Sequence, residues 1–391
     1  MARARGDLAA ARAASEALCE PGRPALTDAL RAVAHAELGA TEFAHGVPEA
    51  AAEQLEAAAA LAAEAGAEWV LLSSGGRSAA LEAASGRLAR AQKAALAAIA
   101  TAERRGWHRS APAAWAYAAL AAVHWQRDEL DDAERRCDSA AVAAHASADA
   151  QALIAARVLR AQLAAAHGDV ERSRGLLSAV EDELPAAGPL LRRWIEALGP
   201  ACCDSAGEGG PIAEAAAWMR RGDPLAALRR VERLAEANPP LHPAARLHAL
   251  AITAVARHAL GRPEEAGRAL EQALALASAD RYRRPFLAGL PLRRLLERQL
   301  DRPTAYAPLA AELLDALQQR DEPPAGLLEP LSERERAVLR LLPTLLSYPE
   351  IGAELFVAAN TVKTHVKSIY RKLDVGSRRE AVTRARALRL I

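Results

Sequence analysis

One short phrase recurs along most of the chain, and its spacing is the strongest constraint on the fold. Each copy has a turn residue, a few polar or Pro positions and then an Ala-rich amphipathic run. The copies begin at Gly6, Gly46, Gly86, Asp128, Gly168, Gly222 and Gly261, at intervals of 40, 40, 42, 40, 54 and 39 residues. Because Pro or an acid in the first turn favours a new helix, each phrase predicts a tight connection between two helices. The repeating unit is therefore a helical hairpin.

A repeat of this length is typical of an α-solenoid of the tetratricopeptide kind, in which each hairpin buries its apolar face against its neighbours. The composition agrees with this prediction. Aromatic residues make up only 4% of the chain whereas alanine is abundant, which favours close-packed helices over sheets. The alternative is that Ala-rich sequence produces similarity by chance, but the regular spacing favours the solenoid. The predicted fold class is all-α.

Two segments interrupt the helical pattern. The 54-residue interval contains residues 198–211, whose Gly, Pro and Ser content predicts a loop between repeats. Residues 320–326 combine charges, paired Pro and Gly, which marks a domain boundary. We therefore predict a repeat domain over residues 1–319, a linker over 320–330 and a separate small domain over 331–391.

The predicted C-terminal domain is basic, although the whole chain has a formal net charge of only +1. Residues 331–391 hold 12 Lys and Arg against six Asp and Glu, which gives this segment a charge of +6 and leaves −5 on the rest. A basic end on a mildly acidic body is expected of a nucleic-acid-binding domain.

Three phrases of the form Ser-x-x-Glu predict helix starts in this domain: Ser332 to Glu335, Ser347 to Glu350 and Ser377 to Glu380. Each is the pattern of a capping box, in which the Ser hydroxyl and the Glu carboxylate accept from backbone amides of the first turn. A fourth helix is predicted from about Asn360 to Leu373, and its apolar residues recur at helical spacing to form one stripe: Val362, Val366, Ile369 and Leu373. The opposite face carries Asn360, Lys363, Thr364, Lys367 and Arg371.

The second and fourth of these helices form a recognisable pair. A helix from about Pro349 to Leu355 meets the fourth helix through the short connection 356–359, which is the spacing of a helix-turn-helix. A helix that is buried on one side and basic on the other suits the major groove of DNA. Taken singly, a basic face is usually only solvated and capping boxes are common. Their conjunction within about sixty residues favours the helix-turn-helix.

The residues of this segment resemble the LuxR-type DNA-binding domain, over residues 331–391. The resemblance is carried by Leu331-Ser-Glu-Arg-Glu-Arg-Ala-Val-Leu-Arg-Leu-Leu342, Glu350-Ile351, Asn360-Thr-Val-Lys-Thr-His-Val366 and Ile369-Tyr-Arg-Lys-Leu373. Two positions depart from the family pattern: Leu345 replaces the usual Gly, and Ala358 replaces the Ser that usually caps the recognition helix. We therefore expect Asn360 to act as the cap and to start that helix late.

The resemblance implies roles for individual side chains. It implies that Lys363, Thr364 and Lys367 face DNA base edges. It implies phosphate contacts from Asn360, Thr361, His365, Arg371, Lys372 and Arg378, and a dimer contact through Ala381, Val382, Ala385 and Leu388 of the last helix. The chemistry of the cations agrees with the first two sets, because Lys donates to guanine O6 and N7 while flanking cations find the backbone. For the last helix, simple packing onto the domain core is the alternative.

Repeats followed by such a domain are also similar to the large ATP-binding LuxR-family regulators, which include the maltose-regulon activator. Members of that group carry a nucleotide-binding domain ahead of the repeats. No G-x-x-x-x-G-K-[ST] phrase exists here, and the nearest phrase, residues 73–78, lacks both its Lys and its spacing. We therefore do not carry over nucleotide binding, and because the repeats begin almost at Met1 we expect a truncated or shortened relative.

Other kinds of chemistry have no sequence signal. The cysteines Cys19, Cys137, Cys202 and Cys203 lack zinc or disulfide-framework spacing, and no nucleophile motif stands out. We expect no metal, no cofactor and no enzymatic activity. The longest apolar stretch, residues 111–123, is too short to cross a bilayer, and an apolar signal core is lacking at the N-terminus. We expect a cytoplasmic protein without membrane partners.

Two hypotheses for function follow. In the first, the chain is a transcriptional regulator that binds promoter DNA, as a homodimer, while the repeats sense a small-molecule or protein effector. In the second, it is an interaction scaffold whose C-terminal domain contacts RNA polymerase or another protein. A cluster of rings at Trp115, Tyr117 and Trp125 is a candidate lining for an effector groove, with core packing as the commoner alternative. The Lys-rich face opposite Val362 and Val366 favours the first hypothesis.

Overall fold

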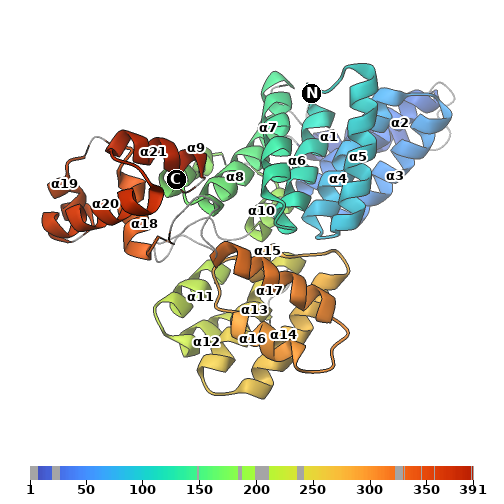
Figure 1. Cartoon of the computed structure of the whole chain (residues 1–391). Helices are drawn as coiled ribbons and strands as arrows, with labels where there is room; N and C mark the ends of the chain where they lie inside the picture. The colour runs from blue at the N-terminus through green and yellow to red at the C-terminus, as the bar shows by residue number, and fades with distance from the viewer. Residues whose placement is uncertain are drawn as a thin grey trace. The chain divides into compact units, whose positions relative to one another are not determined.

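The structure, a computed structural model, is built from helices in all its described parts (Figure 1). It describes residues 8–19, 27–147, 149–183, 187–198, 211–235, 242–321, 329, 331–344, 346–355, 357–388 and 390. The chain divides into two compact units, one formed by residues 1–163 and 173–313 and the other by residues 164–172 and 314–391. The domain boundaries expected from the sequence stay a prediction. The expected loop at 198–211 and the expected linker lie largely outside the described residues, as do Cys202 and Cys203.

The repeat array begins with seven helices of similar length after a first short one. These are α1 (Leu8–Cys19), α2 (Asp28–His45), α3 (Pro48–Glu64), α4 (Glu68–Ala84), α5 (Leu88–Arg105), α6 (Ala111–Gln126), α7 (Leu130–Ser147) and α8 (Ala150–Ala166). They continue as α9 (Val170–Glu181), α10 (Pro189–Ala197), α11 (Pro211–Arg220), α12 (Pro224–Ala235), α13 (Pro243–Ala259), α14 (Pro263–Ser278), α15 (Arg284–Leu287), α16 (Arg293–Leu300) and α17 (Ala307–Asp321). The all-α prediction is confirmed.

The recurring phrase marks the turn inside each hairpin. Its leading residue has a positive φ at all six described copies: Gly46, Gly86, Asp128, Gly168, Gly222 and Gly261. At Gly46 the backbone ends α2 in the left-handed conformation, and its N–H donates to the carbonyl of Glu42. Glycine takes this conformation without strain, which explains why it recurs there. Pro48, Pro224 and Pro263 then stand at the first position of the second helix, as the phrase predicts.

The helices approach closely because small side chains fill the contacts between them. Most of the alanines on α6 have no exposed surface, and this helix lies between α4, α5 and α7. The phrase at residues 73–78 lies in the middle of α4. A Cβ atom on Gly76 would come 2.3 Å from the backbone oxygen of Pro112, so Gly76 lets α6 start directly against α4. This Gly-rich phrase is thus a helix-packing feature.

The aromatic cluster of α6 belongs to the core. Trp115, Tyr117 and Trp125 are all buried. The indole N–H of Trp115 donates to Asp149 (3.0 Å), and that of Trp125 donates to the backbone oxygen of Leu198 (2.7 Å). Trp115 also packs edge-on against Phe43. These rings therefore fill the array and do not line an effector groove.

The later part of the array packs back onto the turns of the earlier hairpins. The hydroxyl of Tyr282 donates to the backbone oxygen of Gly86 (2.9 Å), and the Asp280 carboxylate accepts from the N–H of Ala89 (2.7 Å). A few residues on, Arg284 pairs with Asp128 at 2.9 Å. Successive turns of the array are thereby joined by one segment that lies about 160 to 200 residues further along the chain.

No helix in the described part of the chain is long and apolar enough to cross a membrane.

Candidate nucleic-acid interface

The C-terminal domain consists of α18 (Glu333–Leu341), α19 (Tyr348–Glu354), α20 (Ala359–Leu373) and α21 (Arg378–Ala387), at the red end of the chain in Figure 1. Ser332 caps α18 as predicted, because its hydroxyl accepts from the N–H of Glu335 while the Glu335 carboxylate accepts from the N–H of Ser332. At α19 the Glu350 carboxylate accepts from the N–H of Ser347 (2.7 Å). The three predicted helix starts are confirmed.

The start of α21 differs in one detail from a standard capping box. The hydroxyl of Ser377 accepts from the N–H of Glu380 as expected, but the Glu380 carboxylate accepts from the N–H of Gly376. The carboxylate therefore bonds one residue earlier than the capping residue. The bond from Gly376, together with a side-chain hydrogen bond from Ser377, keeps the pKa of Glu380 below its ordinary value.

The apolar stripe predicted for the recognition helix, α20, forms the centre of the domain core. Val362, Val366, Ile369 and Leu373 are all buried. They pack with residues that lie on or next to the other three helices: Leu331, Val338, Leu339, Leu342, Ile351, Ala381 and Ala385. Burial of this stripe fixes which face of α20 points outward.

The connection between α19 and α20 is a tight turn. The N–H of Val357 donates to the oxygen of Gly352 (2.8 Å), and a Cβ on Gly352 would come 2.6 Å from the oxygen of Val357. The helix α20 then begins at Ala359, with Ala358 as the capping residue and no side-chain hydrogen bond to its first turn. The expected cap by Asn360 is therefore wrong, because Asn360 already lies inside the helix. The other departure, Leu345, lies outside the described residues.

The three residues expected to read bases lie together on the outer face of α20. Lys363, Thr364 and Lys367 are exposed. The hydroxyl of Thr364 donates to the backbone oxygen of Asn360 (3.0 Å), which leaves its oxygen lone pairs as acceptors. The two lysine ammonium groups, one helical turn apart, can donate to purine edges. The threonine oxygen beside them can accept from a base amino group.

Four of the residues expected to contact phosphates also lie on the surface of this helix. Asn360, Thr361 and Arg371 are exposed, and His365 is half-buried. Arg371 is already engaged by a carboxylate, since both of its terminal nitrogens lie 2.8 Å from the two oxygens of Glu329. This ion pair raises the pKa of Arg371 and lowers that of Glu329. The guanidinium thus presents two parallel N–H groups, which could also donate to the oxygens of a phosphate.

Two other residues of the expected phosphate set are held inside the domain. Lys372 is only 9% exposed, and its ammonium lies 2.7 Å from the Glu335 carboxylate. Arg378 donates to the backbone oxygens of Leu342 and Thr344, at 2.8 and 2.9 Å, and so satisfies carbonyls at the end of α18. Both cations thus have structural partners within the domain, and their expected phosphate contacts stay a prediction.

The Glu335 carboxylate is the polar centre of the domain and was not expected from the sequence as more than a cap. Besides Lys372 it accepts from the hydroxyl of Ser368 (2.6 Å), while it is itself only 5% exposed. Burial opposes its ionisation, but the donors Lys372, Ser368 and Ser332 outweigh burial and lower its pKa to about 2. From the sequence, the position of Glu335 at the third residue of α18 predicts only its role in the cap. Its partners on α20 could not be predicted, because they lie more than thirty residues further along the chain.

The expected dimer stripe is divided between core and surface. Ala381 and Ala385 have no exposed surface and belong to the domain core, which agrees with the packing alternative for these two residues. Val382 and Leu388 are half-buried and pack on the edge of the same core. Only these two members of the stripe retain surface for a contact.

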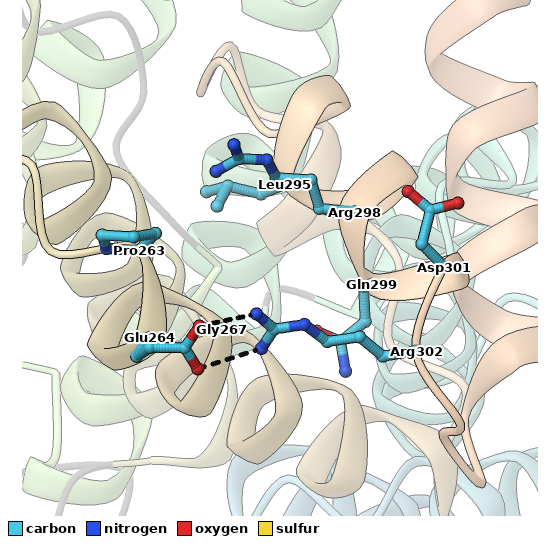
Figure 2. A pocket seen from close by; sticks show the side chains of 8 residues that line it. All are labelled: Pro263, Glu264, Gly267, Leu295, Arg298, Gln299, Asp301 and Arg302. Atoms are coloured by element: carbon cyan, nitrogen blue, oxygen red, sulfur yellow. Dashed lines mark hydrogen bonds and ion pairs between the residues drawn. The ribbon is translucent and has the colours of Figure 1, made fainter.

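A separate pocket of about 400 Å³ lies in the repeat array, between α14 and α16 (Figure 2). Glu264 and Arg302 face each other across it and form a two-fold ion pair at 2.9 and 3.4 Å. Its buried side is occupied by Gln299, which donates to Glu271. Because Glu264 and Arg302 satisfy each other's charge, this ion pair is a structural contact between α14 and the turn after α16.

A four-helix domain, in which a short turn leads into an exposed, basic recognition helix, defines the C-terminal region as a helix-turn-helix domain of the DNA-binding class. Residues 329–385 match the family model of the bacterial regulatory proteins of the luxR family. This region is a LuxR-family helix-turn-helix domain.

Curated relatives match the same end of the chain. The chain is 45% identical over 83 residues to the probable transcriptional regulatory protein NarL of two Mycobacterium tuberculosis strains, CDC 1551 / Oshkosh and H37Rv, covering 21% of this chain and 37% of each relative. It is 48% identical over 59 residues to the HTH-type transcriptional regulator MalT of Serratia proteamaculans, covering 15% of this chain and 6% of that protein. The chain thus spans well under half the length of these relatives.

Proposed function

We propose that the chain is a DNA-binding transcriptional regulator whose α20 lies in the major groove of promoter DNA. The observation that carries the proposal is the two-sided character of this helix, which is buried along Val362 and Ile369 and exposes Lys363 and Lys367 on the other side. The relatives described above are regulators by name, which supports the same conclusion.

Within this function, Lys363, Thr364 and Lys367 are the base-reading residues. The phosphate contacts come from Asn360, Thr361, His365 and Arg371. Base contacts carry the sequence information, whereas phosphate contacts carry salt-dependent affinity. The two sets are therefore separable by experiment.

Selection of binding sites from random duplexes with the full chain tests the proposal. Lys363→Ala should weaken binding to the selected duplex by roughly 1 to 3 kcal/mol and binding to a scrambled duplex much less. Lys93→Ala is the matched control, because Lys93 is an exposed lysine on α5 of the array. If no sequence is enriched at any salt concentration, the chain is better explained as a scaffold that contacts polymerase or another protein.

We also propose that the protein binds DNA as a homodimer through Val382 and Leu388. A dimer requires two half-sites related by two-fold symmetry. Val382→Glu should uncouple the half-sites, whereas Thr383→Glu, which places the same charge on the exposed neighbour, should not. Footprints on both half-sites at unchanged protein concentration for Val382→Glu would show that this residue only packs on the core.

The repeat array is proposed to meet an effector or a protein partner, RNA polymerase included. Trp69 supports a protein partner, because it is 48% exposed and packs edge-on against Trp107 at the array surface. Exposed aromatic residues are frequent binding hot spots. Trp69→Ala should lower promoter-driven transcription in vitro without changing DNA affinity, and Trp218→Ala, another exposed tryptophan, is the control. Equal losses for both variants would count against a specific partner surface.

A further inference from the structure

A single buried carboxylate joins the start of α18 to the second half of the recognition helix. One oxygen of Glu335 accepts from the ammonium of Lys372 (2.7 Å) and from the N–H of Ser332 (2.6 Å). Its other oxygen accepts from the hydroxyl of Ser368 (2.6 Å). Since the side chains of Glu335 and Lys372 are 6% and 11% exposed, water does not compete freely for these bonds.

The two α20 donors occupy positions that govern the orientation of the helix. Ser368 and Lys372 are one turn apart, so both lie on one flank of α20 beside the buried stripe. Each follows an exposed cation in sequence, Lys367 and Arg371. The bonds to Glu335 therefore restrain rotation of the helix about its own axis, and with it the direction in which Lys367 points.

The opposite end of the recognition helix has a weaker restraint. Its capping residue is Ala358, which makes no side-chain hydrogen bond to the first turn. A Ser or Thr at such a position normally satisfies one of the unpaired amides of the first turn. Without that bond, the pose of the first turns, which carry Lys363 and Thr364, depends more heavily on what holds the helix further along.

We propose that Glu335 is a positioning residue for DNA reading, which acts through Ser368 and Lys372 without touching DNA. The proposal rests on the proposed function, in which α20 reads bases. It assigns the sequence preference of the protein in part to a carboxylate on a different helix. Because the missing cap increases the need for this restraint, the effect of breaking it depends on residue 358.

The main test uses Ser368→Ala in the full chain, because this change removes one bond to Glu335 and leaves the Glu335–Lys372 ion pair in place. Affinities are measured for the selected and the scrambled duplex. The ratio of the two should fall by about 3- to 10-fold, the effect of one lost hydrogen bond, with binding to the scrambled duplex unchanged. Thr383→Ala is the control, since its hydroxyl bonds only its own helix (to Arg379) and should leave the ratio unchanged. Equal weakening on both duplexes, or none, overturns the proposal.

A second arm adds the missing cap. In an Ala358→Ser background, Ser368→Ala should change the ratio by less than about 2-fold, because the new cap holds the first turn. Hydrogen exchange of the first-turn amides of α20, measured without DNA, should increase for Ser368→Ala in the original background and not in the Ala358→Ser background. Unchanged exchange overturns positioning whether or not the protein reads DNA. If the wild-type chain shows no sequence preference while exchange behaves as expected, the proposed function fails instead.

Discussion

The repeat array and the C-terminal domain are both made of helices, but different contacts hold them. In the array, α2 and α6 have side-chain caps, but α3, α5 and α14 begin without one, and left-handed turn residues and close contacts of small side chains recur throughout. In the C-terminal domain, serine caps begin α18 and α21, and a buried carboxylate joins α18 to α20. The array should therefore respond most to added volume, and the domain to lost polar partners.

The stabilities of the two regions should differ most clearly when the pH is lowered. His242 and His248 are buried in the array, and burial lowers the pKa of each to about 4. His242 accepts from the N–H of Ala244 through Nδ1 while its other ring nitrogen contacts the oxygen of Ala83, so protonation breaks the cap. A folded-state pKa below the unfolded one means that stability is present at neutral pH and is lost between about pH 6.5 and 4. The loss should reach roughly 3 kcal/mol for each histidine.

Denaturant unfolding followed by tryptophan fluorescence measures the array alone, because all six tryptophans precede residue 219. His248→Asn keeps a donor for the oxygen of Ala244. Between pH 6.5 and 4, the unfolding free energy of this variant should therefore fall less than that of the wild type. In the C-terminal domain the pKa of Glu335 is lowered to about 2, so its contribution is lost only as the pH falls from about 4.5 towards 2. At pH 5 the backbone amides of α18 to α21 should stay protected from hydrogen exchange while the stability of the array falls. If both regions lose their structure over the same pH range, the predicted difference between them is wrong.

A pair of neighbouring glycines in α4 tests the sensitivity of the array to volume. Gly76→Ala would place a Cβ 2.3 Å from the oxygen of Pro112, so α6 must move. This displacement should lower the stability of the array by about 1 to 3 kcal/mol. Gly75→Ala meets only the Cβ of Ala98 at 3.5 Å, an ordinary contact, and should stabilise α4 by about 0.5 to 1 kcal/mol. Tryptophan fluorescence during denaturant unfolding measures both. Similar stabilities for the two variants would show that the α4–α6 contact is not limiting.

How much could be predicted from the sequence also differs between the regions. In the array, the turn phrase and its period were enough, because a left-handed turn residue is a local property of the backbone. In the domain, the caps at Ser332 and Ser347 and the stripe from Val362 to Leu373 were visible for the same reason. The roles of Lys372 and Arg378 were not, since their partners, Glu335 and the carbonyls after α18, are distant in sequence. The position of Lys372, three residues after the buried Ile369, was the one local hint that it lies beside the core.

Removal of a cap should affect the domain more than the array. Ser332→Ala removes the acceptor for the N–H of Glu335 and should destabilise α18 by about 1 kcal/mol. Ser110→Ala removes the corresponding cap of α6, where the bond is longer, at 3.4 Å, and the helix is buried among its neighbours. Hydrogen exchange of the first-turn amides should therefore increase more in α18 than in α6. The reverse order would mean that packing holds the domain helices as firmly as those of the array.

The smallest expected effect lies at the surface of the domain, where Glu329 and Arg371 form an exposed ion pair. If Arg371 contacts a phosphate, the carboxylate of Glu329 competes with that phosphate for the same two donors. Glu329→Gln should then raise affinity for a scrambled duplex by about 2- to 5-fold at low salt, in keeping with the small energies of exposed pairs, and the gain should vanish at high salt. Glu354→Gln removes the same charge from an exposed position on α19 and separates this competition from a change in net charge. Arg371→Ala should weaken binding more in the Glu329→Gln background than in the wild type, because the released guanidinium makes a fuller phosphate contact. Equal losses in both backgrounds would show that Glu329 does not occupy the site of a phosphate, and that Arg371 serves only to hold the start of the domain.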